Sequence, residues 1–143
     1  MRTHLFVIPF IAFAAAQAAP GFKQKVSFQA FTTWAKGAST PGAGFKETKE
    51  EGEAYLAYFK AGGETFTVKI EGAGKFESLA PGAKPFAWKG AEAKWQGADP
   101  PLIAVKYGEV KATFSVTFSG SRPRTQKELE KTLTDLKPEQ ILK

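Results

Sequence analysis

Two arginines beside a predicted helix start form the most focused positive feature of the sequence. Arg122 and Arg124 lie in SGSRPR, residues 119–124, directly before Thr125. Thr125 and Glu128 form a T-x-x-E capping box, which predicts that a helix begins here. The free N–H groups of a helix start favour anions, and arginine can bind a phosphate or carboxylate through two parallel hydrogen bonds. We therefore predict an anion-binding site at Arg122, Arg124 and Thr125, with a plain linker as the alternative.

A set of aromatic residues is the second candidate for binding. Aromatic side chains that exceed the needs of a small core could line a pocket between a helix and a sheet, and such a pocket would accept an apolar ligand. The commoner use of these residues is packing in the core, which stays open as the alternative. The residues assigned to this predicted pocket are Trp34, Trp88, Tyr55, Tyr58 and Tyr107.

The segment FAWKGAEAKW, residues 86–95, combines two tryptophans with two lysines. Aromatics interleaved with lysines can bind nucleic acid, but the same pattern fits a strand with one buried and one solvated face. We favour the strand, with Trp95 in the core and Lys94 in solvent, so nucleic acid is not an expected partner. Trp88 and Trp95 are seven residues apart, and a turn or bulge at Gly90 would bring both onto the core side.

Several kinds of catalysis are excluded by composition. Beyond residue 18 the chain has no Cys, His or Met. It therefore lacks the side chains of Ser-His-Asp and Cys-His catalysis and the usual ligands of zinc, copper, haem and iron–sulfur centres. We expect no enzyme activity, no metal and no cofactor. A pair of distant glutamates meeting in a cleft would still permit a hydrolase that uses carboxylates alone.

The N-terminus has the pattern of a secretory signal. Arg2 precedes a twelve-residue apolar run from Leu5 to Ala16, and Ala16-Gln17-Ala18 fits a signal-peptidase site. The run is shorter than the roughly 20 residues that a spanning helix needs. We predict cleavage after residue 18, a mature chain of residues 19–143 that forms one domain, and a periplasmic or secreted location with no stable membrane span.

The charge of the mature chain is positive but dispersed. Cleavage removes Arg2 and no acid, which leaves 19 Lys and Arg against 14 Asp and Glu, a formal charge of +5. Such a balance attracts anionic envelope components, yet it also occurs simply as a solubilising surface.

Hydrophobic patterning indicates about six strands. Alternation predicts a strand from Val26 to Trp34, then a long polar connection over residues 36–53 with a short helical turn at residues 47–51. A hairpin is expected at Gly62-Gly63, because glycines between two β-rich runs are typical of tight turns. Residues 110–118 alternate most regularly and form the clearest predicted strand.

One helix is predicted after these strands. Leu129, Leu133 and Leu136 form an apolar stripe on one helix face, and Lys131 can pair with Asp135 on another. The stripe must be buried, and the large apolar surface available is one face of the sheet. The fold class is therefore α+β, with a single twisted antiparallel sheet and one C-terminal amphipathic helix packed on it.

These elements resemble a known group of proteins. GETFTVKIEG at residues 63–72, Gly-Ala-Glu-Ala before Trp95, the long final strand and the leucine-striped helix are similar to small extracytoplasmic bacterial α+β domains. Some of these domains lie at the outer ends of anti-sigma factors. The resemblance covers residues 54–137; it implies a sensing or binding module and carries no catalytic residues over to this chain.

The function expected from the sequence is that of an exported, non-enzymatic binding or interaction domain, whose partner is a protein or an anionic envelope component. One alternative is a carrier that shields an apolar or lipid-like small ligand under the helix. The other is the hydrolase that uses carboxylates alone.

Overall fold

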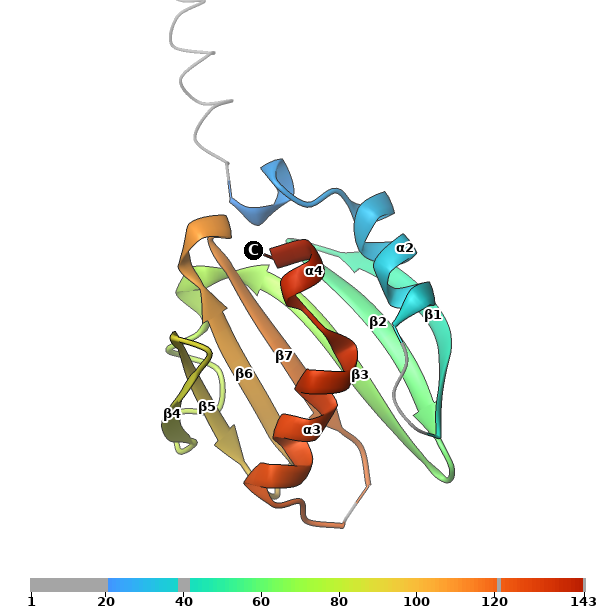
Figure 1. The fold of residues 1–143 in the computed structure, drawn as a ribbon, viewed down its shortest axis with the longest axis vertical. Helices are drawn as coiled ribbons and strands as arrows, with labels where there is room; N and C mark the ends of the chain where they lie inside the picture. The colour runs from blue at the N-terminus through green and yellow to red at the C-terminus, as the bar shows by residue number, and fades with distance from the viewer. Residues whose placement is uncertain (1–20, 39–41, 121, 143) are drawn as a thin grey trace, which may run out of the picture.

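A computed structural model of the chain describes residues 21–38, 42–120 and 122–142, and the predicted signal at residues 1–18 lies outside them. The fold is α+β, with one antiparallel sheet whose front face carries the helices (Figure 1). The predicted class and the single antiparallel sheet are confirmed, but the sheet has seven strands and there are two longer helices. The helices are α2 (Phe28–Gly37), α3 (Gln126–Leu136) and the four-residue α4 (Glu139–Leu142).

The sheet consists of two meanders that meet in its middle. The strand order is β1-β2-β3-β7-β6-β5-β4, and every neighbouring pair is antiparallel. After β3 the chain crosses to the far edge and returns strand by strand, so that the hairpin of β4 and β5 stands at one edge. The strands are β1 (Ala43–Glu51), β2 (Ala54–Ala61), β3 (Glu64–Gly72), β4 (Lys84–Trp88), β5 (Ala91–Gln96), β6 (Leu102–Tyr107) and β7 (Ala112–Phe118).

The strand predicted from Val26 to Trp34 is wrong, because this segment forms helix α2. The Ser27 hydroxyl caps the helix by accepting a hydrogen bond from the Ala30 N–H at 3.0 Å. Phe31, Trp34 and Ala35 follow a spacing of three and four residues, lie on one helix face and are buried. Phe31 is an apolar residue at a position where the alternation of a strand requires a polar one. It belongs instead to the buried face of the helix, with Trp34 and Ala35.

The polar connection predicted over residues 36–53 and its helical turn at residues 47–51 are also wrong, since residues 43–51 form strand β1. Only one face of this edge strand meets the core, and there Phe45 packs edge-on against Phe59 of β2 with 5.9 Å between the ring centroids. Most other β1 side chains are exposed, many of them charged. Charged side chains on an edge strand hinder its pairing with another sheet.

Helix α3 agrees with its prediction. The capping box of Thr125 and Glu128 is present, and Leu129, Leu133 and Leu136 are 0–1% exposed. The helix packs over β5 and β6 (Figure 1). The predicted pair of Lys131 and Asp135 forms with 3.1 Å between charged atoms.

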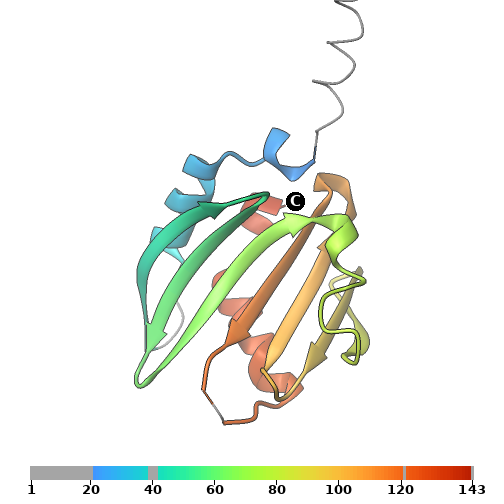
Figure 2. The ribbon, with the colours of Figure 1, turned by 180° about the vertical axis from the view of Figure 1, so that it is seen from behind.

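The back of the sheet is partly covered by the connection between β3 and β4 (Figure 2). Phe76 in this connection packs against Leu102 and Ala104 of β6. Lys94 lies beneath it, 8% exposed, with Nζ 4.7 Å from the Phe76 ring centroid. The prediction that Lys94 is solvated is therefore wrong, whereas Trp95 packs against the core as predicted but is only half-buried.

Candidate functional site

Two aromatic side chains flank an alanine at one end of the sheet. A two-residue turn at Lys89 and Gly90 joins β4 to β5, with positive φ at both residues (49° and 85°), as the twist of a tight hairpin favours. This turn pairs Trp88 with Ala91, and Tyr107 follows in register on β6. Trp88 and Trp95 consequently lie on the same, helix-bearing face of the sheet, as predicted from a turn at Gly90.

A cleft of about 690 Å³ opens beside this row. Trp88 and Tyr107 supply aromatic walls, and Ala91 between them is too small to fill the space. Helix α4 contributes Glu139 and Leu142 from the other side. Lys89 and Glu109 add charged side chains, whereas Glu92 and Lys106 border the cleft but alternate with Ala91 and Tyr107 and so direct their side chains to the back of the sheet.

Glu139 holds the two aromatic side chains together. Its Oε2 accepts hydrogen bonds from the Tyr107 hydroxyl at 2.9 Å and from Trp88 Nε1 at 3.3 Å. Its Oε1 lies 3.5 Å from Nζ of Lys89. One carboxylate thus fixes both aromatic walls of the cleft and one of its lysines. Neither Glu139 nor Lys89 is among the site residues predicted from the sequence.

The environment of this cluster sets its protonation. Burial acts to raise the pKa of Glu139, but hydrogen bonds from Tyr107 and Trp88 and the nearby Lys89 outweigh it and lower the pKa below its ordinary value. Burial, together with the adjacent carboxylate, raises the pKa of Tyr107 well above its ordinary value. At neutral pH the cluster therefore holds an ionised carboxylate and a protonated phenol, a state suited to orienting side chains.

A break between two helices places Glu139 over the cleft. Helix α3 ends at Leu136, Lys137 takes a left-handed conformation with φ of 55°, and Pro138 begins the next turn. The Lys137 carbonyl accepts a hydrogen bond from Trp34 Nε1 at 3.3 Å, which ties α2 to the break. Trp34 thus supports the site indirectly.

The five aromatic residues predicted to line one pocket are not brought together. Trp88 and Tyr107 line the cleft. Tyr55 is 2% exposed, and its hydroxyl donates to the Val26 carbonyl at 2.9 Å. Tyr58 alternates with the core residues Ala57 and Phe59, so it faces the back of the sheet.

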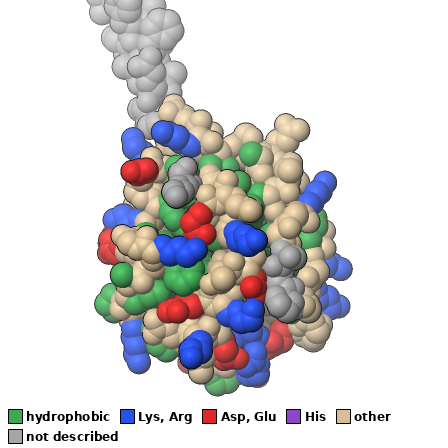
Figure 3. Space-filling view, in the orientation of Figure 1, with side chains coloured by type: hydrophobic (Ala, Val, Ile, Leu, Met, Phe, Trp, Pro, Cys, Tyr) green, Lys and Arg blue, Asp and Glu red, His purple; other side chains and the backbone are tan. Residues whose placement is uncertain are grey.

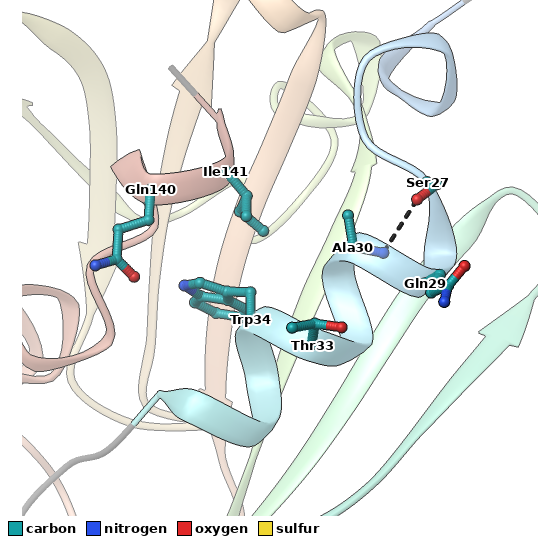
Figure 4. Close-up of a pocket in the computed structure, with 7 residues that line it drawn as sticks. All are labelled: Ser27, Gln29, Ala30, Thr33, Trp34, Gln140 and Ile141. Atoms are coloured by element: carbon teal, nitrogen blue, oxygen red, sulfur yellow. Dashed lines mark hydrogen bonds between the residues drawn. The ribbon is translucent and has the colours of Figure 1, made fainter.

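Trp34 lines a second hollow, of about 540 Å³, between α2 and α4 (Figure 4). The indole lies between the two helices, and polar side chains surround it. They are neutral, so this hollow lacks the ionised carboxylate found in the cleft. Its lining residues are Ser27, Gln29, Ala30, Thr33, Trp34, Gln140 and Ile141.

Both predicted anion-binding arginines face carboxylates of the same chain. Arg122 Nη1 lies 3.2 Å from Glu128 Oε2 on the exposed side of α3. Arg124 pairs with Glu64 and stacks on Phe118, with the guanidinium 3.9 Å from the ring centroid and the side chain 12% exposed. The Thr125 hydroxyl is engaged in capping the helix. An incoming anion would have to displace these carboxylates, so anion binding here stays a prediction.

Other surface features are dispersed. Basic and acidic side chains alternate over the helix-bearing face without a single-sign patch (Figure 3). Within the described residues, no helix is long and apolar enough to cross a membrane, and no group of three or more Asp or Glu side chains is arranged to hold a metal ion.

Comparisons with protein-family models, with curated proteins and with solved structures found no match to this chain. The resemblance to extracytoplasmic α+β domains therefore stays a prediction.

Proposed function

We propose that this chain is a non-enzymatic binding domain that works outside the cytoplasm and holds a small ligand in the cleft between the β4–β5 hairpin and α4. The observation that carries the proposal is the carboxylate of Glu139, which fixes Trp88 and Tyr107 through one oxygen. Binding sites typically combine apolar walls with a few fixed polar groups, and walls that are already ordered lose little entropy when a ligand enters.

The two alternative functions receive less support. A carrier with its ligand under the helix would need space beneath α3, yet Leu129 and Leu133 are fully buried against the core. A hydrolase that uses carboxylates alone needs one carboxylic acid that keeps its proton. The pKa of Glu139 is instead lowered, and its two oxygens serve Trp88, Tyr107 and Lys89.

The test is to map binding onto the cleft by NMR. The mature protein, labelled with ¹⁵N, would be titrated with a panel of sugars, amino acids, amines, carboxylic acids and small aromatic compounds. We expect at least one compound to shift the indole N–H signal of Trp88 and the amide signals of Gly90 and Tyr107.

Two leucine substitutions supply the blocked variant and its control. Ala91→Leu places a larger side chain between the aromatic walls and should abolish the shifts. Ala87→Leu lies on the same hairpin but on the opposite face, where Ala87 is exposed, and should preserve them. Shifts that survive Ala91→Leu, or a panel in which no compound perturbs the cleft, would overturn the proposal.

A further inference from the structure

The cleft already contains an ammonium group of the chain itself. Nζ of Lys89 lies 5.4 Å from the centroid of the Trp88 ring and 3.5 Å from Oε1 of Glu139. A cation placed over an indole face and beside a carboxylate is the arrangement by which proteins bind organic cations. The position of Lys89 therefore marks where such a cation is stabilised in this cleft.

We infer that the ligand is a primary alkylammonium compound, which binds by displacing the ammonium of Lys89. This inference rests on the proposed function and names the class of ligand. Lys89 can leave readily, because it belongs to an exposed turn and its side chain is 59% exposed. Ion pairs of this kind contribute little to stability, since solvent screens them.

The rest of the cleft suits a cation on an aliphatic chain. Ala91 and the Tyr107 ring offer apolar contact for methylene groups. Glu109 also lines the cleft, and within the described part of the chain it has no ion-pair partner within 4 Å. Glu92 and Lys106 point to the back of the sheet, where Glu77 engages Lys106 at 3.1 Å. Once Lys89 swings aside, the local charge is therefore negative.

The positive charge of the whole protein opposes this binding only weakly. At physiological ionic strength, exposed charges are screened over about 8 Å, so lysines elsewhere on the surface have little effect at the cleft. Glu139 is only 25% exposed, so its attraction for a cation in contact with it is screened less.

The same ammonium chemistry occurs in free diamines and in lysine side chains of peptides. Pentylamine is the simplest probe of this class, and pentanol and pentanoate are matched compounds that lack the cation. Cadaverine and Nα-acetyl-lysine amide represent the two sources. We expect pentylamine to shift the Trp88 indole signal, the two matched compounds to leave it unchanged, and the tighter of the two source compounds to identify the source.

Four substitutions test the contacts. Lys89→Ala removes the internal competitor and should tighten pentylamine binding about two- to fivefold, the range that corresponds to an exposed ion pair. Lys84→Ala is the matched control, because Lys84 lies 5.4 Å from the Trp95 ring centroid at the far end of the same hairpin, and it should leave affinity unchanged. Glu139→Gln should weaken binding about tenfold or more. Trp88→Leu, which removes the indole face and is followed through the amide signals of Gly90 and Tyr107, should weaken it about threefold.

The outcomes separate this inference from the proposed function. Equal or weaker binding by Lys89→Ala, or pentanol binding as well as pentylamine, would overturn the ammonium site. If pentylamine fails while another compound of the NMR panel binds at the cleft, the ligand class is wrong and the binding function stands. Far-UV circular dichroism and urea midpoints of each variant show whether the fold persists, and Trp88→Leu keeps the inference testable if Glu139→Gln does not fold.

Discussion

Tyr107→Phe isolates the hydrogen bond that ties β6 to α4. The substitution removes one hydroxyl, which donates to the partly buried carboxylate of Glu139 at 2.9 Å, and leaves the ring in place. Hydrogen bonds to charged groups contribute about 1.5 to 3 kcal/mol, and partial solvent access reduces this value. We expect the free energy of unfolding to fall by about 1 to 2 kcal/mol at pH 7. Urea denaturation followed by far-UV circular dichroism measures the change.

The same variant should change how stability depends on pH. The folded state lowers the pKa of Glu139, so the stability from this carboxylate is present above its unfolded pKa of about 4.3 and is lost as the pH falls through the folded pKa. The folded state raises the pKa of Tyr107. The stability that its protonated hydroxyl contributes is therefore fully present below about pH 10 and is lost as the pH rises further. The difference between wild type and Tyr107→Phe should thus be largest between about pH 5 and 10.

The loss of stability above about pH 10 has a definite expected size. A group that stays protonated only in the folded state costs about 1.4 kcal/mol of stability one pH unit above its unfolded pKa, or about 1 kcal/mol for a ring that solvent partly reaches. The difference between the two proteins should therefore shrink by about 1 kcal/mol from pH 9 to pH 11. Tyr55, whose pKa burial also raises, is present in both proteins and cancels.

Tyr58→Phe is the control for this prediction. Tyr58 is half-buried on the back of the sheet, and its hydroxyl has no hydrogen-bond partner within the described ranges, so the change should lie within about 0.5 kcal/mol. Equal effects of the two substitutions, or a pH-independent difference for Tyr107→Phe, would refute the assigned role of Glu139.

Three further predictions concern other parts of the chain. Leu133→Ala should cost about 2 to 5 kcal/mol of unfolding free energy, because this side chain is fully buried, and an unchanged denaturation midpoint would contradict the docking of α3. N-terminal sequencing of the protein from its own host should begin at Ala19, whereas an intact Met1 in the membrane fraction would rule out the predicted cleavage. If Arg122 and Arg124 bind an anionic partner, salt-sensitive retention on an anionic resin should be lost when both become alanine and should persist when two exposed lysines, Lys60 and Lys127, are replaced instead.

The C-terminal half of the fold could be predicted because its sequence signals are local. The capping box at Thr125, the leucine stripe of α3 and the regular alternation of β7 each depend on residues a few positions apart. The hairpin at Gly62-Gly63 is of the same kind, and all these elements form, although β7 begins at Ala112 rather than at the predicted Val110.

The N-terminal half could not be predicted in the same way, because tertiary contacts decided between two periodicities. Residues 28–35 fit an alternating strand or a helix, and the helix forms because Phe31, Trp34 and Ala35 then reach the core together. Strand β1 has few apolar side chains of its own and is held by pairing with β2. Its propensity alone gives no indication of that partner.

The cleft itself was only partly predictable. Trp88 and Tyr107 were chosen for their aromatic character, but Glu139 is 51 and 32 residues away from them along the chain, and no sequence spacing joins these positions. Lys94 illustrates the same limit, since the connection that covers it comes from another part of the sequence.

The position of the cleft follows from the end of α3. Had α3 continued past Leu136, the chain would have run straight on along the helix axis at Glu139. The left-handed Lys137 and the following Pro138 instead turn the chain, and the Trp34 indole of α2 holds the Lys137 carbonyl in this turn. Helix α2 is far from the cleft residues in sequence, but through Trp34 it helps to fix the turn that positions Glu139 between Trp88 and Tyr107. A substitution such as Trp34→Phe, which keeps a six-membered aromatic ring but removes the pyrrole ring with its N–H, would loosen that turn and should affect the cleft before it affects the sheet.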